Sequence, residues 1–212
     1  MRLPSIIPII VIDTPLVVLA SGSPRRHELL LQIGVEHEIR VVDINETCLP
    51  GESPDECVER LALEKARAAL DLFPQALTIG SDTMVVIDDQ VLGKPRDRAH
   101  GLQMLEWLSG REHEVLTAVA MTVTGRELSC VQRSKVLFRQ LTSTEIAAYW
   151  QTGEPYDKAG GYAIQGIAAQ FVERLDGSYS GVMGLPLYET AQLLREFDIN
   201  LVDKNQLESY DA

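Results

Sequence analysis

One turn of the sequence has the residue types that bind a phosphate group. Ser21-Gly22-Ser23-Pro24-Arg25-Arg26 follows an apolar run and begins a helical pattern. A turn of this kind presents unpaired backbone N–H groups and the positive end of the helix dipole, and both favour a bound anion. Because cations in the first turn oppose that dipole, Arg25 and Arg26 indicate an anion beside them. The alternative is a solvated pair of surface arginines.

Two lysines and two acids elsewhere in the chain could act on a bound phosphate. Lys65 falls on the apolar face of a helical pattern that begins at Ser53, so it either extends to the rim or meets an anion in a cleft. Asp82 follows an apolar run, where a carboxylate caps a turn or takes part in catalysis. Lys94 and Glu46 carry little weight alone, and Glu46 reads as an ordinary solvated acid.

As a set, these charged residues suit the hydrolysis of a phosphoanhydride. Acids hold a divalent metal ion and activate water, while bases neutralise the charge that develops on the phosphates. We therefore expect Arg26, Lys65, Asp82 and Lys94 to converge on one cleft.

The length and charge of the chain limit its partners. Its 212 residues are 45% hydrophobic, enough to bury a core as one compact unit. With 19 basic and 31 acidic side chains, the net charge is −12. A surface of this sign repels polyanions, so we expect neither long nucleic acid nor a membrane as a partner. A small polyanion remains compatible, because a few cations can converge in one cleft.

The cysteines and the N-terminal segment bear on location. Cys48, Cys57 and Cys130 are an odd number without metal-ligand spacing, which favours free thiols in a reducing compartment, the cytoplasm. Residues 1–15 contain a short apolar run interrupted by Pro8. This run is too short to cross a membrane and lacks a cleavage pattern, so we interpret it as an added arm.

Apolar runs alternate with helical patterns along the chain, which indicates an α/β fold. The expected strands are residues 16–20, 77–80, 84–87, 91–92, 114–123, 131–138 and 171–175, with a hairpin turn about Asp88-Asp89-Gln90. The expected helices are residues 25–33, from Ser53, about 98–109, from Thr142 and after Pro186. Asp82 then lies where two extended segments meet. The domain is expected over residues 16–198, with a tail at 199–212.

A series of motifs in fixed order resembles one protein family. The motifs are Ser21-Gly22-Ser23-Pro24-Arg25-Arg26, Arg60-Leu61-Ala62-Leu63-Glu64-Lys65-Ala66, Gly80-Ser81-Asp82-Thr83, Gly93-Lys94-Pro95, Asp157-Lys158-Ala159-Gly160, Gln165-Gly166 and Gly184-Leu185-Pro186. Spread over residues 16–194, they resemble the Maf family of nucleotide pyrophosphatases. The combination is far more specific than any single motif.

The resemblance implies a fold and an activity. The fold is a mixed, elongated, twisted sheet flanked by helices, with two lobes around a deep cleft, as in inosine-triphosphate-pyrophosphatase-like proteins. The activity is cleavage of a nucleoside triphosphate to the monophosphate and pyrophosphate with a divalent cation, Mg²⁺ or Mn²⁺, in a homodimer. Asp82 matches the family's proton acceptor, and Lys65 and Lys94 match lysines that face the phosphates. Glu46 matches a cleft carboxylate, which makes Asp82 and Glu46 the expected metal ligands; whether Asp82 is base or ligand stays open.

Three positions indicate a branch within the family. Arg25, Thr83 and Gln165 match the specificity positions of the branch that acts on dTTP and UTP, whose expected role is to clear non-standard pyrimidine nucleotides. Gln165 offers an amide donor and a carbonyl acceptor, which suit the O4/N3 edge of thymine or uracil. Ser21 and Arg26 are the expected contacts to the rest of the substrate. The branch that prefers 7-methyl-GTP has other residues at all three positions.

Two other functions stay open at this point. One is a nucleotide-binding regulator of septation or cell division whose hydrolysis is incidental, since Maf proteins are linked to division arrest. The other, weaker one is a generic α/β phosphotransferase, although the sequence lacks a Walker loop and a kinase-type glycine-rich signature.

Overall fold

The computed structural model of the protein describes residues 15–201. The predicted arm at 1–15 and the predicted tail at 199–212 therefore lie almost entirely outside the described residues.

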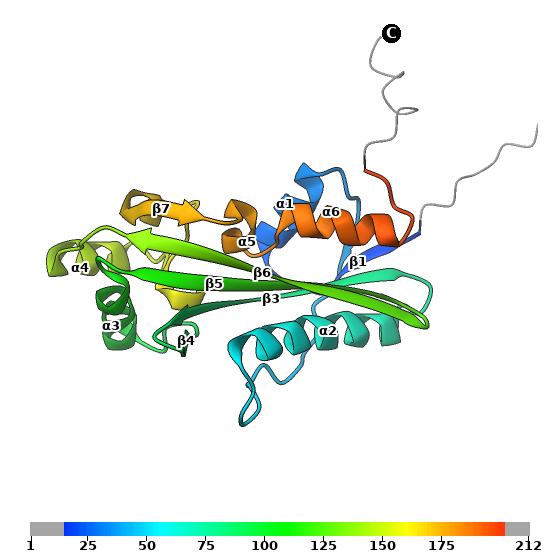
Figure 1. Ribbon diagram of the computed structural model, residues 1–212, viewed down its shortest axis with the longest axis horizontal. Helices are drawn as coiled ribbons and strands as arrows, with labels where there is room; N and C mark the ends of the chain where they lie inside the picture. The colour runs from blue at the N-terminus through cyan, green and yellow to red at the C-terminus, as the bar shows by residue number, and fades with distance from the viewer. Residues whose placement is uncertain (1–14, 202–212) are drawn as a thin grey trace, which may run out of the picture.

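A seven-stranded, twisted sheet runs along the molecule (Figure 1). Its strands are β1 (Val17–Leu19), β2 (Glu38–Ile39), β3 (Leu77–Ile87), β4 (Gln90–Leu92), β5 (Glu112–Val123), β6 (Arg126–Phe138) and β7 (Val172–Asp176). The order is β2-β1-β3-β5-β6-β7, and β4 also pairs with β3. The pairs β1–β2 and β1–β3 are parallel and the others antiparallel. The predicted α/β class with a mixed, elongated sheet is confirmed.

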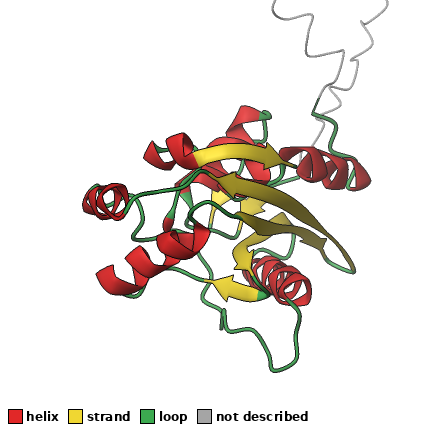
Figure 2. Cartoon of the chain, turned by 60° about the vertical axis from the view of Figure 1, so that its left-hand side comes forward, coloured by secondary structure: helices red, strands yellow, loops and turns green. Residues whose placement is uncertain are grey.

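Helices cover both faces of this sheet, as Figure 2 shows. They are α1 (Pro24–Gln32), α2 (Pro54–Leu72), α3 (Arg98–Leu108), α4 (Ser143–Gln151), α5 (Tyr179–Met183) and α6 (Leu187–Glu196), with short 3₁₀ helices η1 (Ala159–Gly161) and η2 (Ile167–Phe171). In Figure 1, α2 lies below the long strands, while α1, α5 and α6 lie above them.

Local sequence explains where α2 begins. The Ser53 side chain accepts a hydrogen bond from the backbone of Glu56, the Glu56 carboxylate accepts one from the backbone of Ser53, and Pro54 fills the first turn. Thr142 and Glu145 form the same capping box at the start of α4. Both predicted helix starts are confirmed.

The side chains on one face of β3 divide the core into two parts. Ile79 belongs to an apolar cluster with β1, α1 and α6, and Val85 belongs to another with α3, α4 and η2. Between them, Ser81 and Thr83 are polar. The even-numbered residues face α2, where a third cluster forms. Two apolar clusters thus lie on either side of a polar strip, in keeping with the two lobes that the family resemblance implies.

β3 corrects the expected place of Asp82. The sequence predicts two extended segments with Asp82 at their junction, but β3 runs unbroken from Leu77 to Ile87. The reason is long-range: β5 pairs with β3 in continuous register from Thr78 to Val86, so the chain around Asp82 stays extended. Asp82 lies in the middle of a strand.

Other boundaries differ in smaller ways. Asp88 and Asp89 alone form the hairpin turn, both with positive φ, and Gln90 already belongs to β4. β6 begins earlier than expected, at Arg126, and β7 is shifted by one residue. The sequence did not predict β2 or α5, because elements this short show no periodic pattern.

Gly80 determines how closely α2 approaches β3. An added Cβ would lie 2.1 Å from the Ala62 carbonyl oxygen and 2.7 Å from the Ala66 nitrogen. Because both are helix backbone atoms, α2 must move as a unit. We expect Gly80→Ala to lower the free energy of unfolding by about 2–3 kcal/mol, measured by urea denaturation. Gly93→Ala is the control, because nothing lies within 4 Å of a Cβ there. Equal stability of the two variants would contradict the prediction.

Candidate active site

The sheet has an opening along one edge of β3. β1 pairs with β3 only as far as Ile79, and β4 pairs with it only from Val85 onward. Both lie on the same edge, because β5 occupies the other edge throughout. Backbone groups alternate between the two edges, and Ile79 turns its carbonyl toward Ala20 beyond β1. The backbone groups of Ser81 and Thr83 therefore point into the opening.

β1 and β4 run in opposite directions, and the segment that follows each of them lies at this opening. β1 runs parallel to β3, so residues 20–26 pass from Ile79 toward Asp82. β4 runs antiparallel, so Gly93 and Lys94 pass from Val85 toward Thr83. Strand direction alone brings together two motifs that are far apart in sequence.

A cleft of about 600 Å³ occupies this region. All of the predicted site residues line it: Ser21, Arg25, Arg26, Glu46, Lys65, Asp82, Thr83, Lys94 and Gln165. The predicted convergence of Arg26, Lys65, Asp82 and Lys94 on one cleft is confirmed. Their roles in binding and reaction remain predictions.

Lys65 joins the two acidic residues of the site. Its Nζ lies 2.6 Å from Asp82 Oδ1 and 2.6 Å from Glu46 Oε1. The Lys65 side chain is only 9% exposed, so it does not extend to solvent at the rim. Lys65 lies on the buried face of α2, which packs closely on β3 at Gly80, and its ammonium group reaches Asp82 of that strand. In the structure the buried lysine meets two carboxylates of the protein itself.

The charges around Glu46 keep it ionised. The hydrogen bond from Lys65 is the main cause that lowers its pKa below the usual value, and the positive charges of Lys94 and Arg26 act in the same direction. Partial burial opposes the shift. Because the pKa is lowered, the pairing of Glu46 contributes to stability above the ordinary glutamate pKa and is lost as the pH falls through the lowered value.

Arg26 is fixed across the cleft. Its Nε donates to the Gly184 carbonyl (2.8 Å), Nη1 to Ser21 Oγ (3.1 Å) and Nη2 to Thr83 Oγ1 (3.3 Å). Burial lowers the pKa of Arg26, and the charge of Asp82 opposes that shift. Three hydrogen bonds at partly buried sites rule out the alternative of a solvated surface arginine for Arg26.

Arg25 and the start of α1 complete that wall of the cleft. Arg25 Nε donates to the Met183 carbonyl at 3.1 Å, and burial lowers the pKa of Arg25 while Asp157 opposes the shift. The N-cap residue Ser23 makes no side-chain capping bond. The first N–H groups of α1 thus have no cap from the Ser23 side chain, and the first turn of the helix lines the cleft.

Several residues in the cleft or behind its lining were given no role by the sequence analysis. Met183 and Gly184 supply the carbonyls that fix the two arginines, and Lys158 also lines the cleft. Gly184 and Lys158 belong to motifs of the family resemblance, but no role was predicted for them. Thr117, fully buried on β5, lies 3.0 Å from Thr83 Oγ1 and donates to the Gly181 carbonyl. A polar residue within the apolar run of β5 is a signal that could have identified Thr117.

Residues 16–197 match the protein family described as Maf-like protein. The chain belongs to the Maf family. None of the relatives described next is named as a regulator of cell division, so the comparisons give that alternative no support.

Three bacterial relatives are named dTTP/UTP pyrophosphatase. That of Alkalilimnicola ehrlichii is 54% identical over 195 residues, covering 88% of this chain and 95% of its own. That of Vibrio cholerae is 53% identical over 181 residues (85% and 97%), and that of Pseudoalteromonas translucida is 52% identical over 185 residues (87% and 98%). The Staphylococcus aureus Ham1 structure is 14% identical over 57% of this chain and 71% of its own, with a TM-score of 0.42, too distant to carry an argument.

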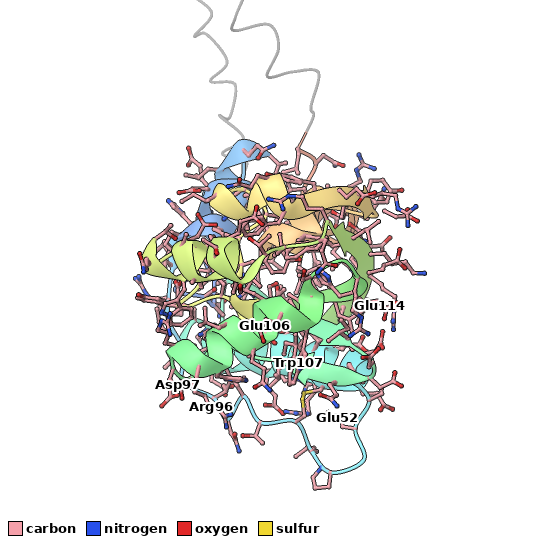
Figure 3. All side chains as sticks on the ribbon, turned by 90° about the vertical axis from the view of Figure 1, so that its left-hand side faces the viewer. Glu52, Arg96, Asp97, Glu106, Trp107 and Glu114 are labelled. Atoms are coloured by element: carbon pink, nitrogen blue, oxygen red, sulfur yellow. A yellow bond between two sulfur atoms is a disulfide. The ribbon has the colours of Figure 1, made fainter. Side chains whose placement is uncertain are left out.

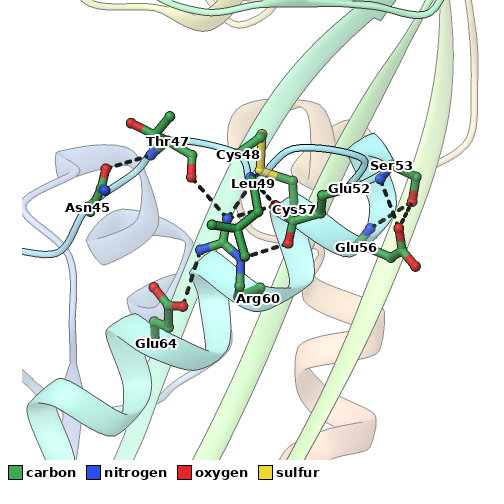
Figure 4. Close-up of polar contacts among 10 residues, drawn as sticks. All are labelled: Asn45, Thr47, Cys48, Leu49, Glu52, Ser53, Glu56, Cys57, Arg60 and Glu64. Atoms are coloured by element: carbon green, nitrogen blue, oxygen red, sulfur yellow. Dashed lines mark hydrogen bonds and ion pairs between the residues drawn. A yellow bond between two sulfur atoms is a disulfide. The ribbon is translucent and has the colours of Figure 1, made fainter.

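Two cysteines of this Maf protein form a disulfide, so the expectation of free thiols is wrong for Cys48 and Cys57. Their Cα atoms lie 5.4 Å apart because the segment before α2 folds back onto its first turns. Arg60 holds the same segment, donating to the Thr47 carbonyl and to both oxygens of Glu52 (Figure 4). Cys130 is the free cysteine of the described residues. The pairing removes the cysteine argument for a reducing compartment.

No helix within residues 15–201 combines the length and the apolar character needed to cross a membrane.

The disulfide makes a measurable prediction about stability. It closes a loop with a sequence separation of 9, which constrains the unfolded chain. We expect the variant Cys48→Ala/Cys57→Ala to lose about 2–3 kcal/mol of unfolding free energy in urea. Dithiothreitol should lower the unfolding free energy of the parent protein by a similar amount and leave that of the variant unchanged. Cys130→Ala is the matched control, and three reactive thiols in the native parent protein would count against the pairing.

Proposed function

We propose that this protein hydrolyses dTTP and UTP to the nucleoside monophosphate and pyrophosphate. The observation that carries the proposal is the pair of carboxylates, Asp82 and Glu46, held by one buried lysine at an opening lined by further cations. Acids beside bases in a cleft of this size suit a polyphosphate substrate. Relatives more than 50% identical that are named dTTP/UTP pyrophosphatase support the choice of substrate.

In the proposed reaction, each charged residue of the cleft has a separate role. Asp82 accepts a proton from the attacking water or orients that water, and both roles are consistent with its place beside Lys65. Lys65 keeps the two carboxylates close together, and Lys94 neutralises charge that develops on the phosphates. Arg26 donates a hydrogen bond to Ser21, and these two residues bind the phosphate chain together with the N-terminus of α1.

A divalent cation, Mg²⁺ or Mn²⁺, is part of the proposal. Carboxylate oxygens are the ligands such ions prefer, and Asp82 and Glu46 bring two of them to the same ammonium group. These two residues would hold the ion, which would activate water and screen the phosphate charge.

We assign the selection of the nucleotide base to residues on the face of β3 opposite Asp82. Successive residues of a strand point to opposite faces, so Thr83 lies across the sheet from Asp82. Thr83 lies beside Arg26, and Gln165 is an exposed residue of the same cleft. We assign Arg25, Thr83 and Gln165 to the base and sugar end of the nucleotide, with the Gln165 amide against the O4/N3 edge of the pyrimidine.

The family resemblance further supports a homodimer that clears non-standard pyrimidine nucleotides. A cytoplasmic location stays a prediction, for which the cysteines no longer argue. The net charge of −12 argues against long nucleic acid as a substrate.

A panel of nucleotides tests the activity. Purified protein with Mg²⁺ should release pyrophosphate from dTTP and UTP faster than from CTP, GTP or 7-methyl-GTP. Asp82→Asn should lower kcat for UTP at least about 100-fold, because the amide cannot accept the proton. It should still bind the nucleotide in calorimetry. Faster release from 7-methyl-GTP would overturn the branch assignment, and full activity of Asp82→Asn would overturn the role of Asp82.

Removal of divalent ions tests the metal. With excess EDTA, pyrophosphate release should fall to the background of Asp82→Asn, because without a cation the two carboxylates repel the phosphates. Added Mg²⁺ or Mn²⁺ should restore the release. Glu46→Gln should raise the Mg²⁺ concentration needed for half-maximal rate. Undiminished activity in EDTA would contradict metal dependence.

A further inference from the structure

The segment that carries Gln165 is held from outside the cleft. Gln165 lies between buried Ile164 and half-buried Gly166, and its own side chain bonds to none of the residues that the structure describes. Its place in the cleft is therefore set by its backbone. The backbone amides on either side of Gln165 are bonded to two side chains, Tyr149 and Glu154.

Glu154 binds the C-terminal side of this segment. Its Oε2 accepts a hydrogen bond from the backbone N–H of Ile167 (2.8 Å), and its Oε1 accepts one from Ala168 (3.2 Å). These N–H groups begin η2, where a carboxylate also meets the positive end of the helix dipole. Charge-assisted bonds of this kind are among the stronger ones in proteins.

Gly166 lets the carboxylate come this close. A Cβ at Gly166 would lie 2.3 Å from Glu154 Oε2, so any other residue there would push Glu154 away. The contact between carboxylate and backbone is therefore direct.

Tyr149 binds the other side of the segment. Its hydroxyl donates to Glu154 Oε1 at 2.8 Å and accepts from the backbone N–H of Ala163 at 3.3 Å. Tyr149 is buried at 2% exposure, and burial, followed by the nearby carboxylate, raises the pKa of its hydroxyl. The hydroxyl keeps its proton at physiological pH and stays a donor to Glu154.

We infer that Glu154, together with Tyr149, is a positioning residue for Gln165 and so sets the preference for uracil and thymine over other bases. The inference rests on the proposed function, in which Gln165 contacts the base. Neither Tyr149 nor Glu154 lines the cleft, so both act only through the segment between them.

Tyr149 and Glu154 lie away from the residues that we assign to the reaction. Tyr149 belongs to the same apolar cluster as Val85, on the face of β3 opposite Asp82 and Lys65. A change at Glu154 should therefore move Gln165 while it leaves the paired carboxylates in place.

The substitution Glu154→Gln tests the inference. A glutamine amide has one acceptor oxygen, and its NH₂ group would face an N–H donor of Ile167 or Ala168. We expect the ratio of kcat/KM for UTP over CTP, which differ at the edge that Gln165 would read, to fall about 10-fold. Most of the change should appear in KM for UTP, with kcat within about twofold of the parent.

The matched control is Glu106→Gln, the same chemical change at an exposed position of α3 (Figure 3). It should leave the ratio unchanged. Tyr149→Phe, which removes the hydrogen bond from Ala163 and the hydrogen bond to Glu154, should lower the ratio in the same direction. In the Gln165→Ala background, Glu154→Gln should cause no further loss of selectivity, because the two residues act through one contact.

A second measurement does not depend on activity. Deuterium exchange of the amides of residues 163–168 should be faster in Glu154→Gln than in the parent or in Glu106→Gln. Unchanged exchange would overturn the inference, and so would an equal fall in the rates for UTP and CTP with the ratio preserved. If the parent protein released pyrophosphate from no nucleotide, the proposed function would fail while the exchange experiment would still decide whether Glu154 positions the segment.

Discussion

β1 and β4 share one edge of β3 without meeting, and this separation is the constraint on which the site depends. It leaves backbone groups of Ser81 and Thr83 directed at a cleft instead of at a neighbouring strand. Such groups need a hydrogen-bonding partner, either water or a ligand, which makes the opening suited to polar molecules. β5 pairs with β3 along the whole opening and keeps the strand extended although one edge is unpaired. The sheet can be interrupted here only because its other edge is continuous.

The charges at the opening depend on one another in a similar way. Lys65 is buried, and a buried ammonium group is tolerated only when it is paired and hydrogen-bonded. Asp82 and Glu46 supply that pairing from β3 and from the segment before α2. The disulfide and Arg60 fasten that segment to α2, so the covalent bond lies two residues from an acid of the site. The disulfide and Arg60 thus help to fix the position of Glu46 relative to Lys65 and Asp82.

The sequence was informative where the determinants are local. The start of α2 could be predicted from Ser53, Pro54 and Glu56, which satisfy each other within one turn. The convergence of the charged residues could be predicted from their chemistry, because acids and bases act together in the hydrolysis of a phosphoanhydride. The place of Asp82 within β3 could not, since it depends on β5, whose pairing no local pattern reveals.

Contacts between distant segments explain the other omissions. Arg26 bonds to Gly184, 158 positions away, and the Cys48–Cys57 pair depends on the path of an irregular segment. Neither has a signature in spacing alone. The motif that contains Gln165 indicated a site residue, but the residues that hold it, Tyr149 and Glu154, lie outside that motif.

The alternation of Asp82 and Thr83 along β3 has a consequence for how such proteins diverge. Neighbouring residues of one strand point to opposite faces of the sheet, so Asp82 and Thr83, for which we propose different roles, belong to separate packing environments. Under the proposed roles, a lineage could replace side chains on the Thr83 face, change the nucleotide that it accepts, and inherit Asp82 intact. The two faces of β3 would then let one ancestral reaction be kept while the range of substrates changes.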